Sequence, residues 1–349
     1  MRALTVEPLK AGSAEVREVA DPEPAAGELL VEGLALGVCG TDREIAAGEY
    51  GWPPPGRDRL VLGHESLGRV LSAPPDRGFA AGDLVVGVVR RPDPEPCGAC
   101  AHGEFDMCRN GRYTECGIKE IDGYGSQRWT VPADYAVGLD ARLADVGVLM
   151  EPTSVVAKAW DQVAKVGGRS WFEPERVLIA GAGPIGLLAA LLGMQRGLEV
   201  HVLDVATDGP KPAVVEALGA RYHSVGMREA VAALRPDIVI EATGVPGVVF
   251  EAMTGNAPYG VVCLTGVSPV GHHISVDIGG ANREMVLEND VVVGSVNANL
   301  GHYAAAATAL ADAELGWLSR LITRRVPLEG FADALQARPD DIKVVLELT

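Results

Sequence analysis

The sequence predicts a two-domain α/β protein in which an irregular β domain precedes a doubly wound parallel sheet. Its 349 residues exceed a single domain of about 150 residues. Near residue 158 the pattern changes from short strands separated by Gly and Pro to apolar strands that alternate with helices. We expect domains at residues 1–157 and 158–300, followed by a C-terminal segment at 301–349.

The first domain is expected to contain few helices. Three apolar, β-rich runs favour strands: residues 28–38, 69–73 and 84–89. Residues 41–47 have the only helical pattern in this part, and Thr41 or Asp42 can serve as its N-cap. The segment 91–103 is rich in Pro, Gly and acidic residues, so it is expected to be a loop.

The second domain is expected to be a parallel sheet with helices on both faces. Five short apolar runs favour buried strands: residues 177–180, 200–204, 237–241, 260–264 and 290–295. Helical segments separate them, beginning with the apolar stretch 185–196. The C-terminal segment contains an Ala-rich helix near 303–311 and a closing strand at 342–348.

Composition argues against several classes of partner. The net charge is −17, from 47 acidic and 30 basic residues, and this field repels nucleic acid and anionic lipid. No apolar run approaches the roughly 20 residues that span a bilayer. Glu7 interrupts the N-terminus where a signal peptide needs apolar residues. We therefore expect a cytoplasmic enzyme that binds neither nucleic acid nor membranes.

A dinucleotide-binding motif lies between the first strand and helix of the second domain. Gly181, Gly183 and Gly186 form G-x-G-x-x-G, in which the glycines permit a tight turn and a close approach of a pyrophosphate to the helix N-terminus. Asp204 follows 18 residues later, where a carboxylate accepts hydrogen bonds from ribose hydroxyls. That carboxylate would repel the 2′-phosphate of NADP, so NAD is predicted rather than NADP. The alternative is a Gly-rich turn and a surface Asp.

Three residues far apart in the chain are candidate ligands of a catalytic zinc ion. Cys39, His64 and Glu151 each lie beside turn residues, and their side chains suit a zinc that keeps one coordination position open. A substrate hydroxyl bound at the open position has its pKa lowered by the zinc, and the resulting alkoxide gives up hydride more readily. Each residue alone has a structural alternative, as a buried free cysteine, a core histidine or an ordinary acid. Their combination with a nicotinamide site favours zinc.

Several stretches resemble one family along the whole chain, at residues 39–45, 62–65, 117–123, 149–152, 241–244, 283–289 and 294–297. They resemble the zinc-dependent medium-chain dehydrogenases and, within them, the glucose dehydrogenase group. The resemblance implies a GroES-like β domain that carries the zinc, a Rossmann domain, and a C-terminal segment that returns to the first domain. It also implies a homodimer or homotetramer.

The resemblance further implies roles for individual residues. Glu65 would exchange into the zinc sphere, and Thr41 would pass the substrate proton towards solvent unless it only caps a helix. Glu115 and Asn297 would hydrogen-bond sugar hydroxyls, although Glu115 could instead be a solvated loop acid. The remaining candidate cofactor contacts are Pro184, Ile185, Thr243, Thr265, Val267, Ser295 and Asn297.

Two departures from the glucose dehydrogenase group affect the expected substrate. Val89 and Val155 occupy positions where some members carry Asn and Asp. Losing two polar contacts should weaken the binding of a fully hydroxylated hexose, because a polyol needs several directed hydrogen bonds. A deoxy sugar, a cyclitol or a related polyol therefore remains open beside glucose.

A second cysteine cluster is a candidate structural zinc site. Cys97, Cys100 and Cys108 follow part of the zinc-lobe pattern of the superfamily, and either Cys116 or His102 could supply a fourth ligand. The alternative is three reduced thiols in a loop.

The predicted function is a zinc- and NAD-dependent dehydrogenase of a sugar or polyol hydroxyl, giving a lactone where the substrate is an aldose oxidised at C1. One alternative is an oxidoreductase for a cyclitol or modified sugar in a specialised pathway. An alternative of another class is a cofactor-binding sensor with a decayed active site.

Overall fold

The computed structural model describes residues 1–349, which form two compact units. The first contains residues 1–154 and 297–349, and the second contains residues 155–296. The boundaries expected at 157 and 300 therefore lie slightly too far along the chain. The reason for the first difference is that the chain passes from one unit to the next inside a helix, α3 (Met150–Gly167), where composition does not change.

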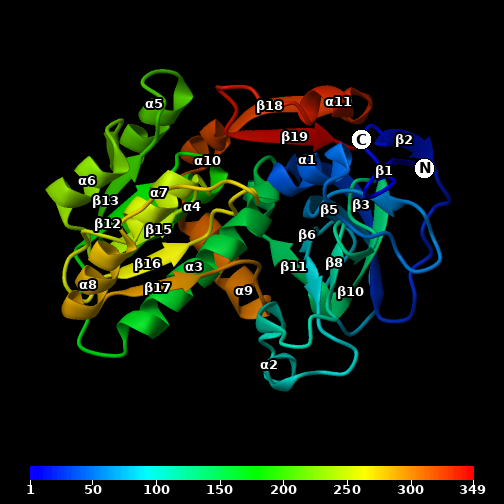
Figure 1. Cartoon of the computed structure of the whole chain (residues 1–349). Helices are drawn as coiled ribbons and strands as arrows, with labels where there is room; N and C mark the ends of the chain where they lie inside the picture. Colours follow the sequence, from blue (N-terminus) through cyan, green and yellow to red (C-terminus); the bar gives the residue numbers. More distant parts are fainter. The chain divides into compact units, whose positions relative to one another are not determined.

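The centre of the first unit is a seven-stranded sheet. Its order is β11-β6-β5-β3-β19-β18, and β10 also pairs with β3. These strands span Ala136–Leu139, Leu84–Gly87, Glu65–Ser72, Glu28–Val38, Lys343–Glu347, Ile322–Pro327 and, for β10, Arg128–Pro132. The C-terminal strand β19 lies between β3 and β18 (Figure 1), antiparallel to the first and parallel to the second. Residues from the two ends of the chain thus share one core.

Two small sheets and several short helices complete the first unit. One sheet joins β2 (Glu15–Glu18), β1 (Arg2–Val6) and β4 (Leu60–Val61), and the other joins β7 (Arg90–Arg91), β8 (Thr114–Cys116) and β9 (Glu120–Ile121). The helices are α1 (Gly40–Ala47), α2 (Gly98–Ala101), α9 (Leu300–Asp312), α10 (Leu315–Leu321) and α11 (Phe331–Ala334). Short 3-10 turns lie at Phe105–Met107, Ala133–Tyr135, Ala141–Leu143, Gly147–Leu149 and Leu328–Gly330. The loop expected at 91–103 contains α2, a single helical turn too short to have a hydrophobic period.

The second unit is a six-stranded parallel sheet in the order β14-β13-β12-β15-β16-β17. The strands span Arg221–His223, Glu199–Leu203, Arg176–Ala180, Ile238–Glu241, Val261–Leu264 and Val291–Gly294. The helices are α4 (Pro184–Gln195), α5 (Pro210–Ala217), α6 (Met227–Leu234), α7 (Pro246–Ala252) and α8 (Ile278–Glu288). This confirms the predicted α/β fold class, including the doubly wound parallel sheet.

The strand β14 was not expected, because its three residues are polar or aromatic and have no apolar run. The order of the strands reverses beside β12, the strand that the Gly-rich motif follows. In sheets of this topology ligands bind beyond the carboxyl ends of the strands at such a point.

None of the helices is both long enough and apolar enough to cross a membrane.

Candidate active site

Cys39 stands at the junction of β3 and α1, where it caps the helix. Its backbone is extended, with φ −121°, and its sulfur accepts a hydrogen bond from the backbone N–H of Asp42. The Asp42 carboxylate accepts the N–H of Cys39 in return, at 2.9 Å. The cap is therefore Cys39 rather than Thr41 or Asp42, since a reciprocal pair satisfies two free N–H groups at once. Thr41 lies inside α1, so the capping alternative for Thr41 is wrong.

His64 lies beside Cys39, at the turn that leads into β5. The turn needs Gly63, whose φ is +97° and whose place beside Leu36 leaves no room for a Cβ. The Cys39 Sγ and His64 Nε2 atoms are 3.1 Å apart. On the other side of the ring, His64 Nδ1 is 3.4 Å from Asp42 Oδ1, and both of these buried atoms lack a hydrogen-bond partner.

Glu65 and Lys343 form a buried ion pair next to this group. Lys343 Nζ lies 2.7 and 2.6 Å from the two carboxylate oxygens of Glu65, and both residues are about 2 % exposed. Gly37 is directly opposite Glu65 on β3, where a Cβ would meet the Glu65 carboxylate. The role of Lys343 was missed in the sequence. The available signal was a lysine at the start of an otherwise apolar closing strand.

Three of the four catalytic zinc candidates come together. The ligand atoms of Cys39, His64 and Glu65 all lie within 4.8 Å of one another, and Glu151 is outside this group. Glu151, the second residue of α3, still interacts electrostatically with this group. Burial raises the pKa of its carboxyl to about 7, and Glu65 adds to the rise, whereas His64 and Lys343 oppose it.

The donor set fits a zinc ion. A thiol, an imidazole and a carboxylate within one coordination sphere are the ligands that catalytic zinc uses. The unpartnered pair of Asp42 Oδ1 and His64 Nδ1 fits as well. A histidine that binds metal through Nε2 commonly donates its Nδ1–H to a carboxylate, which fixes the orientation of the ring.

A buried cluster of polar side chains in the same unit is centred on Glu115. Arg90 and Glu115 are opposite each other on β7 and β8, and Arg90 Nε and Nη2 donate to Glu115 Oε1 at 3.0 and 2.9 Å. Asn297 Nδ2 donates to the same oxygen at 2.6 Å. Glu115 is 6 % exposed, so the alternative of a solvated loop acid is wrong. The three hydrogen bonds all end on Oε1, and Oε2 is left as the acceptor for another donor.

The Gly-rich loop of the second unit has the geometry that its sequence predicts. Gly181 has φ +104°, and Gly183 is the N-cap of α4, which Pro184 begins and Ile185 continues. At Gly186 a Cβ would lie 1.8 Å from the carbonyl oxygen of Gly181, so only glycine permits this close approach.

Asp204 directly follows β13 and is hydrogen-bonded to the Gly-rich loop. Its Oδ2 accepts the N–H of Ala182 at 2.7 Å, and its Oδ1 accepts the N–H of Ala206 at 3.0 Å. Lys211 Nζ lies 3.2 Å from each oxygen, a partner that the sequence analysis did not identify. Burial opposes ionisation, but the two N–H groups and Lys211 outweigh it and lower the pKa of Asp204.

The other cofactor candidates follow neighbouring strands of the same sheet. Glu241, at the end of β15, is fully buried and accepts the N–H groups of Thr243 and Gly244 at 2.7 and 3.1 Å. Thr265 Oγ1 donates to the Glu241 carbonyl at 2.7 Å. Val267 is exposed, and the buried Ser295 Oγ has no hydrogen-bond partner.

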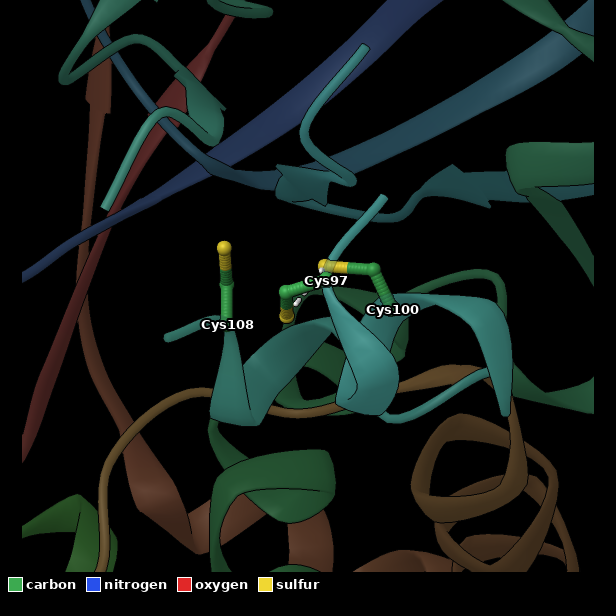
Figure 2. A group of neighbouring side chains, drawn as sticks. All are labelled: Cys97, Cys100 and Cys108. Atoms are coloured by element: carbon green, nitrogen blue, oxygen red, sulfur yellow. Dashed lines mark hydrogen bonds between the residues drawn. The ribbon is translucent and has the colours of Figure 1, made fainter. Parts of the chain in front are cut away.

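The second cysteine cluster is compact (Figure 2). The sulfurs of Cys97, Cys100 and Cys108 lie within 4.8 Å of one another. The N–H of Arg109 donates to Cys97 at 3.3 Å and, with other backbone N–H groups, lowers the pKa of that thiol to about 6. Neither proposed fourth ligand joins the three. Cys116 is buried elsewhere against the Tyr124 hydroxyl, 3.2 Å away, and His102 Nδ1 is hydrogen-bonded to the carbonyl of Gly98.

Comparison with known proteins covers the whole chain. The family model described as "Glucose dehydrogenase C-terminus" matches residues 144–348, and the one described as "Alcohol dehydrogenase GroES-like domain" matches residues 25–141. A glucose 1-dehydrogenase of Methanocella arvoryzae is 40% identical over 100% of this chain and 99% of the relative. One of Thermoproteus tenax is 39% identical with the same coverage.

A solved structure is similar along its full length. It is the glucose dehydrogenase of Haloferax mediterranei in complex with NADP, Zn and gluconolactone, with a TM-score of 0.91 and 33% identity. The match covers 100% of this chain and 99% of that one. These similarities agree with the fold and with the family resemblance seen in the sequence.

Proposed function

Since this chain belongs to the glucose dehydrogenase family of zinc-dependent dehydrogenases, we propose that it oxidises a sugar hydroxyl and transfers the hydride to a nicotinamide dinucleotide. For a glucose-like aldose the reacting centre is C1 and the product is a lactone. The observation that carries the proposal is the convergence of Cys39, His64 and Glu65 on one small volume.

The metal-binding residues divide into ligands and supports. Cys39 and His64 would bind the ion, with Glu151 as the third ligand and Glu65 able to exchange with it. Zinc in this place supplies Lewis acidity, which lowers the pKa of the substrate hydroxyl. Asp42 would orient the His64 ring. Lys343 donates hydrogen bonds to both carboxylate oxygens of Glu65 and so fixes the position of that carboxylate.

Two further sets of residues act on the substrate. The Thr41 hydroxyl, free of a capping role, would take the proton from the sugar hydroxyl and pass it towards solvent. Glu115 Oε2 and the Asn297 amide would hold neighbouring hydroxyls. Arg90 donates two hydrogen bonds to Glu115 and fixes the orientation of its carboxylate, so that Oε2 would accept a hydrogen bond from the sugar.

The dinucleotide would lie on the Gly-rich loop of the second unit. Gly181, Gly183 and Gly186 permit close approach of the pyrophosphate, with Pro184 and Ile185 at the helix N-terminus. Asp204 would bind the adenosine ribose. Thr243, Thr265, Val267, Ser295 and Asn297 follow strand ends and are proposed to line the nicotinamide side.

A less hydroxylated substrate is a second candidate. Val89 is 2 % exposed and packs into the core of the first unit, so its side chain offers no hydrogen bond to a sugar. Val155 is apolar as well. A deoxy sugar would lose fewer contacts here than glucose does, and a cyclitol is the further alternative.

The cluster of Cys97, Cys100 and Cys108 is proposed as a structural zinc site whose fourth ligand is not among the neighbouring protein side chains.

A homodimer or homotetramer is proposed because β17 is an edge strand that carries Val291, Val292 and Val293. The edge strand of a sheet has backbone N–H and C=O groups that can pair with a second copy. Light scattering on a size-exclusion column measures the assembly.

The proposed function is tested by reduced-nicotinamide absorbance across glucose, deoxy sugars and cyclitols, with NAD and NADP in parallel. Turnover should vanish after chelation and return with added zinc. Cys39→Ser should abolish it, whereas Cys263→Ser, which changes a buried cysteine of the second unit, should not. Turnover that survives complete zinc removal contradicts the mechanism. Binding of nucleotide without turnover of any substrate supports the sensor alternative.

A further inference from the structure

The guanidinium group of Arg90 joins the strand β8 to the 3-10 turn Phe105–Met107. Its Nε and Nη2 atoms donate to Glu115 Oε1, and its Nη1 atom donates to the carbonyl oxygen of Asp106 at 2.8 Å. The Cζ atom of Arg90 lies 3.7 Å from the centroid of the Tyr113 ring, a cation–π contact. Arg90 is 6 % exposed, so these contacts are largely shielded from water. Arg90 therefore fixes Glu115 relative to Asp106.

The segment that precedes α9 is bonded to the same two acids. Asn297 Nδ2 donates to Glu115 Oε1, and Asn299 Nδ2 donates to Asp106 Oδ1 at 2.9 Å. A single buried residue separates the two asparagines. Together with the backbone, these contacts close a hydrogen-bond cycle, whose members are Arg90, Glu115, Asn297, Asn299 and Asp106.

Asn297 has a backbone conformation that the cycle supports. Its φ is +63°, in the left-handed region that side chains other than glycine seldom adopt. Its Oδ1 accepts the N–H of Ala298 at 2.7 Å, so the amide group has one fixed orientation and its Nδ2 is directed to Glu115. Such a conformation persists where neighbouring contacts determine it. Glu115 provides one of these contacts at Asn297, and Asn299 anchors the chain two residues later.

The two ends of the Asn299 amide group have separate roles. Its Oδ1 accepts the N–H groups of Gly301 and His302, which caps α9. Its Nδ2 donates to Asp106, which closes the cycle. A substitution can therefore remove the contact with Asp106 and keep the cap.

We propose that Asn299 and Asp106 are positioning residues for sugar recognition, because their hydrogen bond closes the cycle that holds Asn297 and the Oε2 atom of Glu115 in the orientation that binds substrate hydroxyls. The inference rests on the proposed function, in which Glu115 and Asn297 bind the sugar. Asn299 and Asp106 act through Asn297 and Arg90. Loss of their bond should consequently weaken sugar binding more than hydride transfer.

The test removes this hydrogen bond and then rebuilds it in the opposite direction. Asn299→Asp keeps a cap oxygen but has no N–H for Asp106. The KM for the sugar that the enzyme oxidises fastest should rise by at least about tenfold, while kcat changes by less than about threefold. Adding Asp106→Asn supplies an amide N–H that can donate to the carboxylate at position 299. The double variant should have a KM within about threefold of that of the unchanged protein.

A second variant avoids placing two carboxylates together. Asn299→Ser keeps a capping oxygen without adding charge, and its side chain is too short to reach Asp106, so KM should rise here too. Thermal unfolding checks that each variant is folded. The KM for the coenzyme should change by less than about threefold throughout, because the cycle lies within the first unit.

The matched control makes the same substitution at another asparagine of the first unit. Asn110 Nδ2 donates to Asp93 Oδ2 at 2.9 Å, outside the cycle. Asn110→Asp should leave the KM for the sugar unchanged.

Three results would count against these assignments. A KM that is the same in the unchanged protein, Asn299→Asp and Asn299→Ser would overturn the inference. So would losses of kcat, KM and Tm that occur together and do not recover in the double variant, because they would show a purely structural bond. An unchanged protein that oxidises no sugar would instead overturn the proposed function itself.

Discussion

The His64 ring and the Asp42 carboxylate face each other at 3.4 Å, and neither atom has a hydrogen bond. Leaving two buried polar atoms without hydrogen bonds is costly in free energy. Such an arrangement is understandable where the opposite nitrogen, Nε2, binds a metal that fixes the ring. Asp42 is thus a positioning residue that acts through His64.

Replacing Asp42 by Asn tests this role. The amide can still cap α1 but holds the imidazole less strongly, so zinc affinity should fall by about 10- to 100-fold. Competition with a metal-binding dye measures the change. Asp122→Asn is the control, because it alters an acid that bonds Arg57 and the Val61 N–H and does not contact His64. Unchanged zinc affinity in Asp42→Asn would contradict the role.

The ion pair of Glu65 and Lys343 makes a second prediction. Lys343→Met leaves a buried carboxylate without its cation, which should lower the free energy of unfolding by about 3–5 kcal/mol in urea denaturation with a chelator present. Adding Glu65→Gln should recover most of the loss, since the neutral amide tolerates burial. If the double variant is as unstable as the single one, the destabilisation comes from lost packing instead.

At the scale of elements, the turn between α8 and β17 has an acid in an unfavourable environment. Asp290 Oδ1 accepts the N–H of Gly260 at 3.0 Å, but the buried Oδ2 has no partner. Burial raises the pKa of Asp290 to about 6, and Glu288 and Glu284 add to the rise. A carboxyl whose pKa is raised by folding favours the folded state while protonated, and this contribution is lost as the pH rises through the folded-state pKa.

Asp290→Asn should therefore stabilise the second unit above about pH 6, by about 1 kcal/mol, and have little effect below about pH 4. Thermal unfolding of both proteins across this range gives the difference in Tm at each pH. Asp237, which accepts the N–H groups of Glu175 and Arg176, provides the contrasting control, because Asp237→Asn weakens two hydrogen bonds and should destabilise. An Asp290→Asn effect that is largest at acid pH would refute the assignment.

Packing of the fold does not explain why the sulfurs of Cys97, Cys100 and Cys108 converge at the short helix α2. A bound metal would satisfy three converging sulfurs, and the lowered pKa of Cys97 favours the thiolate that a metal needs. Cys97→Ser with Cys100→Ser should lower the zinc content from about two ions per chain to about one, by elemental analysis of protein purified without chelator. Cys116→Ser should leave it unchanged. About one ion per chain in the unchanged protein would remove the second site.

The whole molecule has 47 acidic and 30 basic residues, and the repulsion among the excess negative charges opposes folding. Salt screens this repulsion, so raising the salt concentration from about 0.05 to about 0.5 M should increase the Tm by a few degrees. Sodium chloride and potassium chloride should act alike if the effect is screening. A Tm that falls with salt would mean that local ion pairs outweigh the net charge.

Sequence patterns identified most of the fold and part of the site. The parallel sheet was predictable because each buried strand is a short apolar run. The Gly-rich loop was predictable because its tight turn and close backbone approach require glycines at fixed spacing. Lys343 and Lys211 were not, since their partners, Glu65 and Asp204, are set by sheet register and by a helix start rather than by spacing. The cap at Cys39 was missed because cysteine is an unusual capping residue.

The position of β19 affects how a nascent chain folds. The sheet of the first unit cannot close until Lys343–Glu347 has been synthesised, because this strand fills the gap between β3 and β18. The second unit, continuous from residue 155 to 296, has all its strands by then. On the ribosome, the portion translated first would consequently be completed last, and its apolar strands would need protection from aggregation while they wait.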